Sequence, residues 1–246
     1  MKSKKQTVLI TGGSGGIGFE LARIFAKNGY DLVLVARTQL ELEKAAQKIR
    51  EESNANVKTI SKDLFDLESA FVLYEEIRQL GIQIDILVNN AGHGHYGPFI
   101  ETELIAELAI IQLNISSLVA ITKLFVKEMV TRGSGKILNV SSAAIQSPGP
   151  YHSVYQGTKA FVQSFTESLR YELKEKGIVV TALLPGATDT DFFNKADMVS
   201  SKIAQQGQLA DPADVAKDGY EALMTGKGKI ISGFRDMMQV DVDQDE

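Results

Sequence analysis

The chain has 246 residues, of which 44% are hydrophobic and 23% charged, and its formal net charge is −5. This length accommodates one large α/β domain or two small ones. The mildly negative charge argues against a general nucleic-acid or anionic-membrane surface. The sequence contains no cysteine, which excludes a disulfide framework, a thiolate nucleophile and a zinc–thiolate site. This composition suits a reducing compartment, so we expect a cytoplasmic protein.

Neither an export signal nor a membrane span is predicted. The apolar run Val8–Ile10 after the basic N-terminus is far shorter than the roughly 7–15 residues of an export signal. We also expect no run that approaches the roughly 18 apolar residues of a span. The sequence therefore predicts neither a membrane partner nor a nucleic-acid partner.

Strand and helix patterns alternate along the chain. Short β-branched runs bounded by turn residues predict seven strands, at 7–10, 31–36, 56–61, 84–88, 136–140, 178–184 and 229–232. Apolar residues at helical spacing predict the helices between them, one ending at Asn28–Gly29, then 38–52, 67–80, 103–131, one containing Tyr155 and ending at Gly177, and 211–224. Alternation of this kind predicts a Rossmann-type, doubly wound parallel sheet with helices on both faces.

We expect a single domain over residues 1–233. Residues 188–207 show no clear period and are predicted to form a substrate loop with short helical pieces. The segment 234–246 is predicted to be a tail whose acidic end is disordered.

A glycine cluster follows the first predicted strand. Gly12, Gly16 and Gly18 would let the backbone approach a pyrophosphate, while the N-terminus of the next helix would supply free N–H groups. The spacing G-x-x-x-G-x-G differs from the usual dinucleotide fingerprint. The cluster alone could be a flexible turn, but its place between a strand and a helix favours a dinucleotide site.

The end of the second strand bears on the choice of cofactor. A carboxylate about 20 residues after the glycines would bind the 2′-hydroxyl of NAD, but the chain has Arg37 and Thr38 there. A cation and a hydroxyl suit a 2′-phosphate. The pattern therefore favours NADP(H) over NAD(H), with a solvated Arg37 and a helix-capping Thr38 as the alternative.

Tyr155 and Lys159 lie four residues apart on a predicted helix and so share one face. A neighbouring ammonium favours the phenolate, so Lys159 is expected to lower the pKa of Tyr155 and make it a usable acid or base. An isolated pair of this kind is more often an ordinary solvated helix face.

Together these residues resemble the short-chain dehydrogenase/reductase family in its single-domain branch, from about residue 6 to residue 231. Ser142 lies thirteen positions before Tyr155, as in the family's catalytic pattern, and Asn114 matches its fourth catalytic residue. The resemblance also implies a set of cofactor-binding residues, which are Gly12, Ser14, Gly16, Ile17, Gly18, Arg37, Thr38, Asp63, Leu64, Asn90, Ala91, Gly92, Tyr155, Lys159, Pro185, Gly186, Thr188 and Thr190.

The resemblance implies hydride transfer between a nicotinamide and a carbonyl or alcohol carbon of a small-molecule substrate. Tyr155 would be the acid/base, Ser142 would bind the substrate oxygen, and Lys159 would bind the ribose. Asn114 would anchor a water in a proton relay, and Ser141 would be a structural hydroxyl at the strand end. A homodimer or homotetramer is implied as well. The alternative is a cofactor-binding regulator without turnover.

Other side chains near the expected site are open to two interpretations. His93 and His95 lack a third ligand in the pattern, so no metal is predicted. His152 is expected to face either the substrate or solvent. Large apolar residues either line a substrate pocket or belong to the core, and these are Tyr96, Tyr151, Phe192, Phe193 and Met198.

Overall fold

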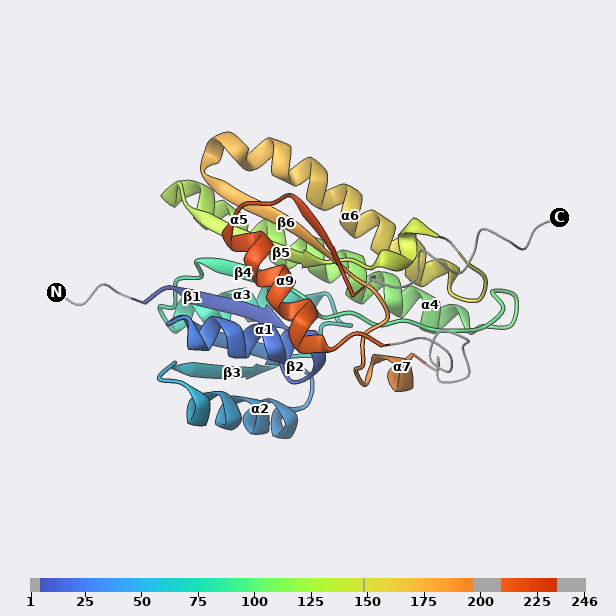
Figure 1. Cartoon of the computed structure of the whole chain (residues 1–246), viewed down its shortest axis with the longest axis horizontal. Helices are drawn as coiled ribbons and strands as arrows, with labels where there is room; N and C mark the ends of the chain where they lie inside the picture. The colour runs from blue at the N-terminus through green and yellow to red at the C-terminus, as the bar shows by residue number, and fades with distance from the viewer. Residues whose placement is uncertain (1–4, 148, 197–208, 234–246) are drawn as a thin grey trace.

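The computed structural model describes residues 5–147, 149–196 and 209–233. The predicted tail at 234–246 and residues 197–207 of the predicted substrate loop, Met198 among them, lie outside the described residues. The described strands form one parallel sheet in the order β3-β2-β1-β4-β5-β6-β7 (Figure 1). Their bounds are β1 Thr7–Thr11, β2 Asp31–Ala36, β3 Val57–Ser61, β4 Ile86–Asn89, β5 Gly135–Val140, β6 Ile178–Pro185 and β7 Lys229–Ser232. The expected Rossmann-type, doubly wound sheet is confirmed.

Helices cover both faces of the sheet. Among the described residues the α-helices are α1 Gly16–Lys27, α2 Gln39–Glu52, α3 Glu68–Gln79, α4 Leu104–Ile111, α5 Leu118–Arg132, α6 Ser153–Leu173, α7 Phe192–Lys195 and α9 Pro212–Met224. Buried side chains of α1, α2 and α9 pack with one face of the strands. Those of α3 and α5, together with partly buried side chains of α6, pack with the other.

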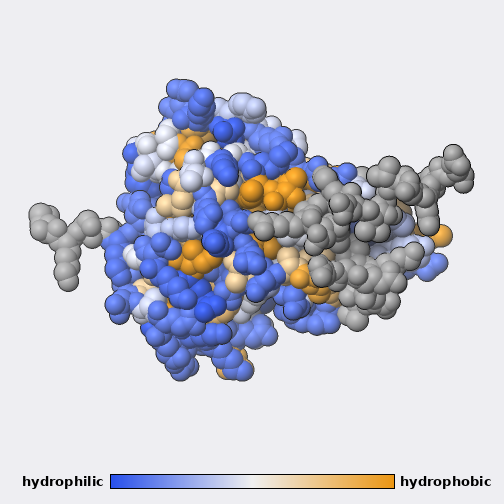
Figure 2. Space-filling view, viewed as in Figure 1, coloured by the Kyte–Doolittle hydropathy of each residue, from blue (hydrophilic) through white to orange (hydrophobic). Residues whose placement is uncertain are grey.

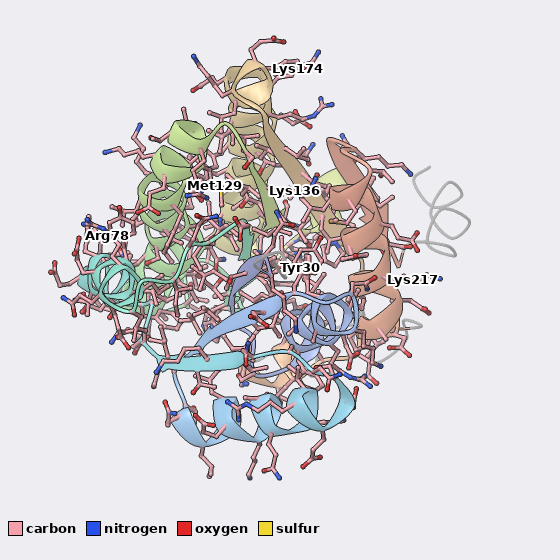
Figure 3. All side chains as sticks on the ribbon, turned by 90° about the vertical axis from the view of Figure 1, so that its left-hand side faces the viewer. Tyr30, Arg78, Met129, Lys136, Lys174 and Lys217 are labelled. Atoms are coloured by element: carbon pink, nitrogen blue, oxygen red, sulfur yellow. The ribbon has the colours of Figure 1, made fainter. Side chains whose placement is uncertain are left out.

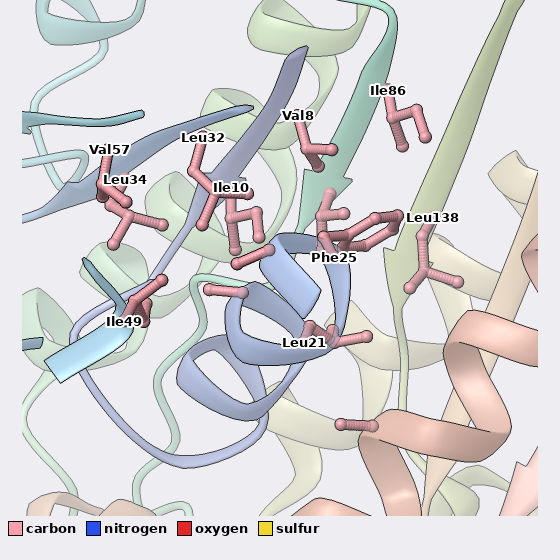
Figure 4. Close-up of a cluster of buried hydrophobic side chains, with 14 of the residues drawn as sticks. Val8, Ile10, Leu21, Phe25, Leu32, Leu34, Ile49, Val57, Ile86 and Leu138 are labelled. Carbon is pink, nitrogen blue, oxygen red and sulfur yellow. The ribbon is translucent and has the colours of Figure 1, made fainter. Parts of the chain in front are cut away.

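The inner strands β1, β2 and β4 are buried on both faces, which explains their continuous apolar runs. Val8, Leu9 and Ile10 are fully inaccessible to solvent, and Figure 4 shows Leu21 and Phe25 of α1 beneath the neighbouring strands. In Figure 3, Arg78, Lys174 and Lys217 extend outward from the helices. The surface facing the viewer in Figure 2 is largely hydrophilic, with small apolar patches. The apolar pattern of the strands therefore reflects burial between two helical layers.

The segment 103–131, predicted as one helix, contains two α-helices. A π-helical turn, η1 Gln112–Ser117, separates α4 from α5. Contrary to the prediction, the helical run Leu104–Arg132 is long and apolar enough to cross a membrane by length and composition. Phe125 and Met129 of this run are buried against the sheet, and a core helix meets the same two criteria.

The strand order reverses between β1 and β4, which are neighbours in the sheet although β2 follows β1 in the sequence. The connections from these two strands therefore leave toward opposite sides of the sheet. A crevice forms at such a switch point, outside the carboxyl ends of the strands, and ligands of open α/β sheets bind there. The fold thus predicts a ligand-binding site at the turns after β1 and β4.

Candidate active site

A cleft of about 600 Å³ opens at this switch point. Most of the residues expected to bind the cofactor line it, and these are Gly12, Ser14, Gly16, Ile17, Arg37, Thr38, Leu64, Asn90, Ala91, Gly92, Tyr155, Lys159, Pro185, Gly186, Thr188 and Thr190. Ser142 lines it too, whereas Gly18, Asp63 and Asn114 lie outside its wall. The cleft therefore brings together residues from turns that are far apart in the sequence.

The glycine turn is shaped by close backbone approach. Gly12 and Gly16 have φ angles of +67° and +53°, a region that favours glycine. A Cβ at Gly18 would lie 2.3 Å from the carbonyl oxygen of Gly12 and 2.4 Å from Nδ2 of Asn90. Gly18 thus supports the turn from behind instead of lining the cleft. The Thr11 hydroxyl accepts hydrogen bonds from the backbone N–H groups of Asn90 and Ala91, which ties the turn after β4 to β1.

Arg37 and Thr38 lie exposed at one end of the cleft. Within the described residues, no carboxylate pairs with Arg37; its guanidinium lies over the Phe65 ring, 5.0 Å from the centroid. Thr38 occupies the N-cap position before α2, but its side chain makes no capping hydrogen bond, so the alternative in which the hydroxyl serves only to cap the helix is not supported. Asp63 is exposed, and its Oδ1 accepts from the backbone N–H of Phe65. A cation and a hydroxyl are thus free for a ligand here.

Tyr155 and Ser142 border the other part of the cleft. Tyr155 is in the first turn of α6, and Ser142 follows β5, where its hydroxyl accepts from the N–H of Ala144 at 3.2 Å. Burial raises the pKa of Tyr155 above its ordinary value, and a hydrogen bond with Ser142 opposes this effect. The neighbouring Ser141 hydroxyl donates instead to the carbonyl oxygen of Lys159 at 2.7 Å, which fits the structural role expected for it.

Lys159 is only 5% exposed. Its ammonium donates to the carbonyl oxygen of Val140 at 2.9 Å and lies 5.9 Å from the Tyr155 ring centroid. Burial lowers the pKa of Lys159 from 10.5 to about 8. The expected lowering of the Tyr155 pKa by this lysine is therefore wrong for this structure, because loss of hydration disfavours the charged form of both groups.

Asn114 lies in the π turn η1 and is 1% exposed. Its side chain accepts from the backbone N–H of His93 and donates to the carbonyl oxygen of His93 and to the Thr158 hydroxyl, each at 2.9 Å. A Cβ at Gly92 would lie 3.4 Å from Oδ1 of Asn114 and 3.1 Å from Nζ of Lys159. The two polar atoms therefore approach the same point beside Gly92.

Aromatic side chains enclose the space next to Tyr155. The Phe192 ring of α7 lies 5.5 Å from the Tyr155 ring, and a Cβ at Gly94 would be 3.0 Å from it. Phe193, His93 and His152 also line the cleft. Burial lowers the pKa of His152, which keeps its ring neutral at about pH 7.

Two of the aromatic candidates lie outside the cleft wall. Tyr96 and Tyr151 pack against each other, with ring centroids 5.5 Å apart, and Tyr96 stacks on His152. Tyr96 therefore supports the cleft wall through His152, and Tyr151 packs behind Tyr96.

Comparison with known proteins decides the family. The family model described as short chain dehydrogenase matches residues 6–199. This chain belongs to the short-chain dehydrogenase family. Its NADPH-bound structural neighbour from Sphingobium yanoikuyae, also a short-chain dehydrogenase, superimposes with a TM-score of 0.86 at 31% identity, covering 92% of this chain and 87% of the other.

Two curated short-chain dehydrogenase relatives have named activities. A very-long-chain 3-oxoacyl-CoA reductase from Rattus norvegicus is 38% identical over 72% of this chain and 57% of its own. A 17-beta-hydroxysteroid dehydrogenase type 3 from Mus musculus is 32% identical over 84% of this chain and 68% of its own. The chain thus spans little more than half the length of the rat relative.

The sequence pattern missed several cleft residues of this short-chain dehydrogenase. Phe65, beneath Arg37, and Lys62, which pairs with Glu76 at 2.9 Å, both line the cleft. They directly flank the Asp63–Leu64 pair, and that adjacency is the signal that could have found them. Lys195, which pairs with Asp191 at 2.9 Å, had no such signal, because its place depends on how α7 folds over the cleft.

Proposed function

We propose that this short-chain dehydrogenase is an NADP(H)-dependent oxidoreductase that transfers a hydride between nicotinamide and a carbonyl or alcohol substrate. The observation that carries the proposal is the convergence of Ser142, Tyr155 and Lys159 on the cleft that also holds the glycine turn. Bound NADPH would supply the hydride. Gly12, Gly16 and the N-terminus of α1 would hold its phosphates.

Tyr155 is the proposed acid in the direction of reduction. Its raised pKa keeps the phenol protonated near neutral pH, so that the hydroxyl can give its proton to the developing alkoxide. Ser142 would hydrogen-bond the substrate oxygen and stabilise its charge. Lys159, charged below about pH 8, would hold the ribose hydroxyls. Asn114 would anchor a relay water at the point beside Gly92 that its Oδ1 shares with Lys159.

NADP(H) is proposed over NAD(H) because of the residues at the end of β2. Arg37 has no carboxylate partner within the described residues, and the Thr38 hydroxyl makes no capping bond, so both can bind a 2′-phosphate. Planar, bidentate recognition of phosphate is what a guanidinium supplies. The NADPH complex of the Sphingobium neighbour is consistent with this preference.

A bulky, largely apolar ketone is the substrate class that we propose. Phe192 and Phe193 present aromatic surface to the cleft next to Tyr155, and such surface binds apolar groups. The names of the rat and mouse relatives, a very-long-chain 3-oxoacyl-CoA reductase and a hydroxysteroid dehydrogenase, point to large substrates as well.

We further propose a cytoplasmic homo-oligomer. Leu104, Ile105 and Leu108 of α4 are 66%, 75% and 49% exposed, and burying such side chains against a second copy would stabilise a dimer. Light scattering tests this proposal, and a monomeric mass at micromolar concentration would refute it. The regulator alternative is not favoured, because the proposed catalytic side chains are all present and gathered at one site.

The decisive experiment compares Tyr155→Phe with Tyr171→Phe, a change at a 75% exposed tyrosine on the same helix. NADPH oxidation is measured with a panel of aliphatic, aromatic and steroidal ketones and 3-oxoacyl thioesters. We expect Tyr155→Phe to lose at least about 100-fold in kcat, the contribution of a general acid, while still binding NADPH by fluorescence titration. Tyr171→Phe should match the wild type. Ordinary turnover by Tyr155→Phe would disprove the assignment.

A further inference from the structure

A buried hydrogen bond links the proposed adenosine end of the cleft to the π turn η1. The Ser117 hydroxyl donates to the carbonyl oxygen of Leu64 across 2.6 Å. Ser117 is 1% exposed and Leu64 is 4% exposed. Leu64 borders the cleft beside Phe65, on which Arg37 rests. Ser117 therefore holds, from behind, a peptide that forms part of the cleft wall.

The same π turn carries Asn114. Its amide exchanges two hydrogen bonds with the backbone of His93 and donates a third to Thr158, so this side chain is held at the other end of the cleft. A π turn closes with i→i+5 hydrogen bonds and is wider than an α-helical turn, and such turns are frequent at functional sites. Ser117 and Asn114 thus attach one short turn to two separate parts of the cleft wall.

On one side of the Ser117–Leu64 hydrogen bond, the surrounding side chains leave a small cavity. This cavity of about 10 Å³, about the space of one water molecule, is lined by Thr11, Leu64, Asn89, Ala91, Leu113, Ser117, Leu118 and Ile121. Oδ1 of Asn89 is buried without a hydrogen-bond partner. Leu64 and Leu113 of the π turn belong to the same buried cluster, and the Ser117 hydrogen bond adds a directional polar link between the Leu64 peptide and this turn.

We propose that Ser117 is a positioning residue that couples occupation of the adenosine end to the placement of Asn114. This inference rests on the proposed NADP(H)-dependent function. Adenosine bound against Leu64 and Phe65 restrains that loop, the Ser117 hydrogen bond transmits the restraint to η1, and Asn114 is held where the proton relay needs it. Coupling of this kind requires a physical connection with a defined free energy, which one buried hydrogen bond supplies.

The first test compares Ser117→Ala with Ser116→Ala. Ser116 lies in the same turn, and no hydrogen bond of its side chain is found among the described residues. Single-turnover reduction of the best ketone of the panel is measured at saturating NADPH and at saturating reduced nicotinamide mononucleotide, which lacks the adenosine.

We expect Ser117→Ala to reduce the NADPH rate about tenfold, as loss of one buried hydrogen bond predicts. The mononucleotide rate should not change, Ser116→Ala should leave both rates unchanged, and Ser117→Thr, which keeps the hydroxyl, should restore the NADPH rate. An equal loss with both cofactors, or no loss with NADPH, would overturn the coupling.

The second test needs no variant. Hydrogen exchange of the wild-type protein is followed with and without adenosine 2′,5′-bisphosphate, which can fill only the adenosine end. We expect slower exchange in residues 62–66 and also in residues 112–117. Protection confined to residues 62–66 would overturn the coupling while leaving the proposed function intact. Failure of both this fragment and NADPH to bind would instead refute the proposed function.

Discussion

Replacing Lys159 by methionine tests how burial acts on the proposed active site. The side chain is 5% exposed, and burial lowers its pKa from 10.5 to about 8. A pKa difference of one unit corresponds to about 1.4 kcal/mol. At neutral pH, burial of Lys159 therefore lowers the free energy of unfolding by about 3 kcal/mol relative to a lysine whose pKa does not change on folding. Between these two pKa values the unfolded chain binds more protons than the folded one, so stability rises with pH there.

The measurement is the free energy of unfolding of the wild type and of Lys159→Met at several pH values, by denaturant titration without cofactor. Because methionine cannot titrate, we expect the wild type to gain about 2 kcal/mol relative to the variant between about pH 7 and about pH 9.5. Lys44→Met, at an exposed lysine on α2, is the matched control and should show no such gain. A wild-type-minus-variant difference that is constant with pH would refute the reasoning.

Three further predictions concern cofactor and substrate. Arg37→Ala should raise KM for NADPH at least about tenfold through loss of charge-assisted hydrogen bonds. Steady-state kinetics should show KM for NADH nearly unchanged. Equal increases in the two KM values would contradict the NADP proposal. Gly18→Ala places a Cβ 2.3 Å from the carbonyl oxygen of Gly12, so calorimetry should show NADPH affinity reduced at least about tenfold; wild-type affinity would contradict this. Gly94→Ala places a Cβ 3.0 Å from the Phe192 ring, so the ring must shift. KM for bulky ketones should therefore change more than KM for acetone, and equal changes would contradict this.

Much of the cleft was predictable because its motifs are local. Glycines at fixed offsets after a β-branched strand predict a phosphate-binding turn from backbone geometry alone, and the structure lines the cleft with Gly12 and Gly16. The pair Asp211–Pro212 is likewise typical of a helix start, and the Asp211 carboxylate accepts from the N–H of Ala213 at 2.8 Å. Such features depend on residues within one or two turns of each other.

Local patterns failed where a distant segment decides the outcome. Thr38 has the sequence of a helix cap, yet it makes no such bond. The segment 103–131 was expected to be one helix. Instead, the polar side chains of Asn114 and Ser117 hydrogen-bond to His93 and Leu64, and a π turn lies between α4 and α5. Tertiary hydrogen bonds of this kind carry no signature within the helix itself.

The amino-acid sequence by itself determined the order of the elements, the parallel sheet and the identity of the residues at the switch point. These follow from apolar periodicity, turn chemistry and the handedness of strand–helix–strand connections. Only the tertiary structure decided the protonation behaviour of Tyr155 and Lys159. Their spacing on one helix predicts that each side chain stabilises the charged form of the other. In the folded protein, however, β5 and the turn after β4 enclose both side chains. Burial raises the pKa of Tyr155 and lowers that of Lys159, and burial depends on elements that only folding brings together.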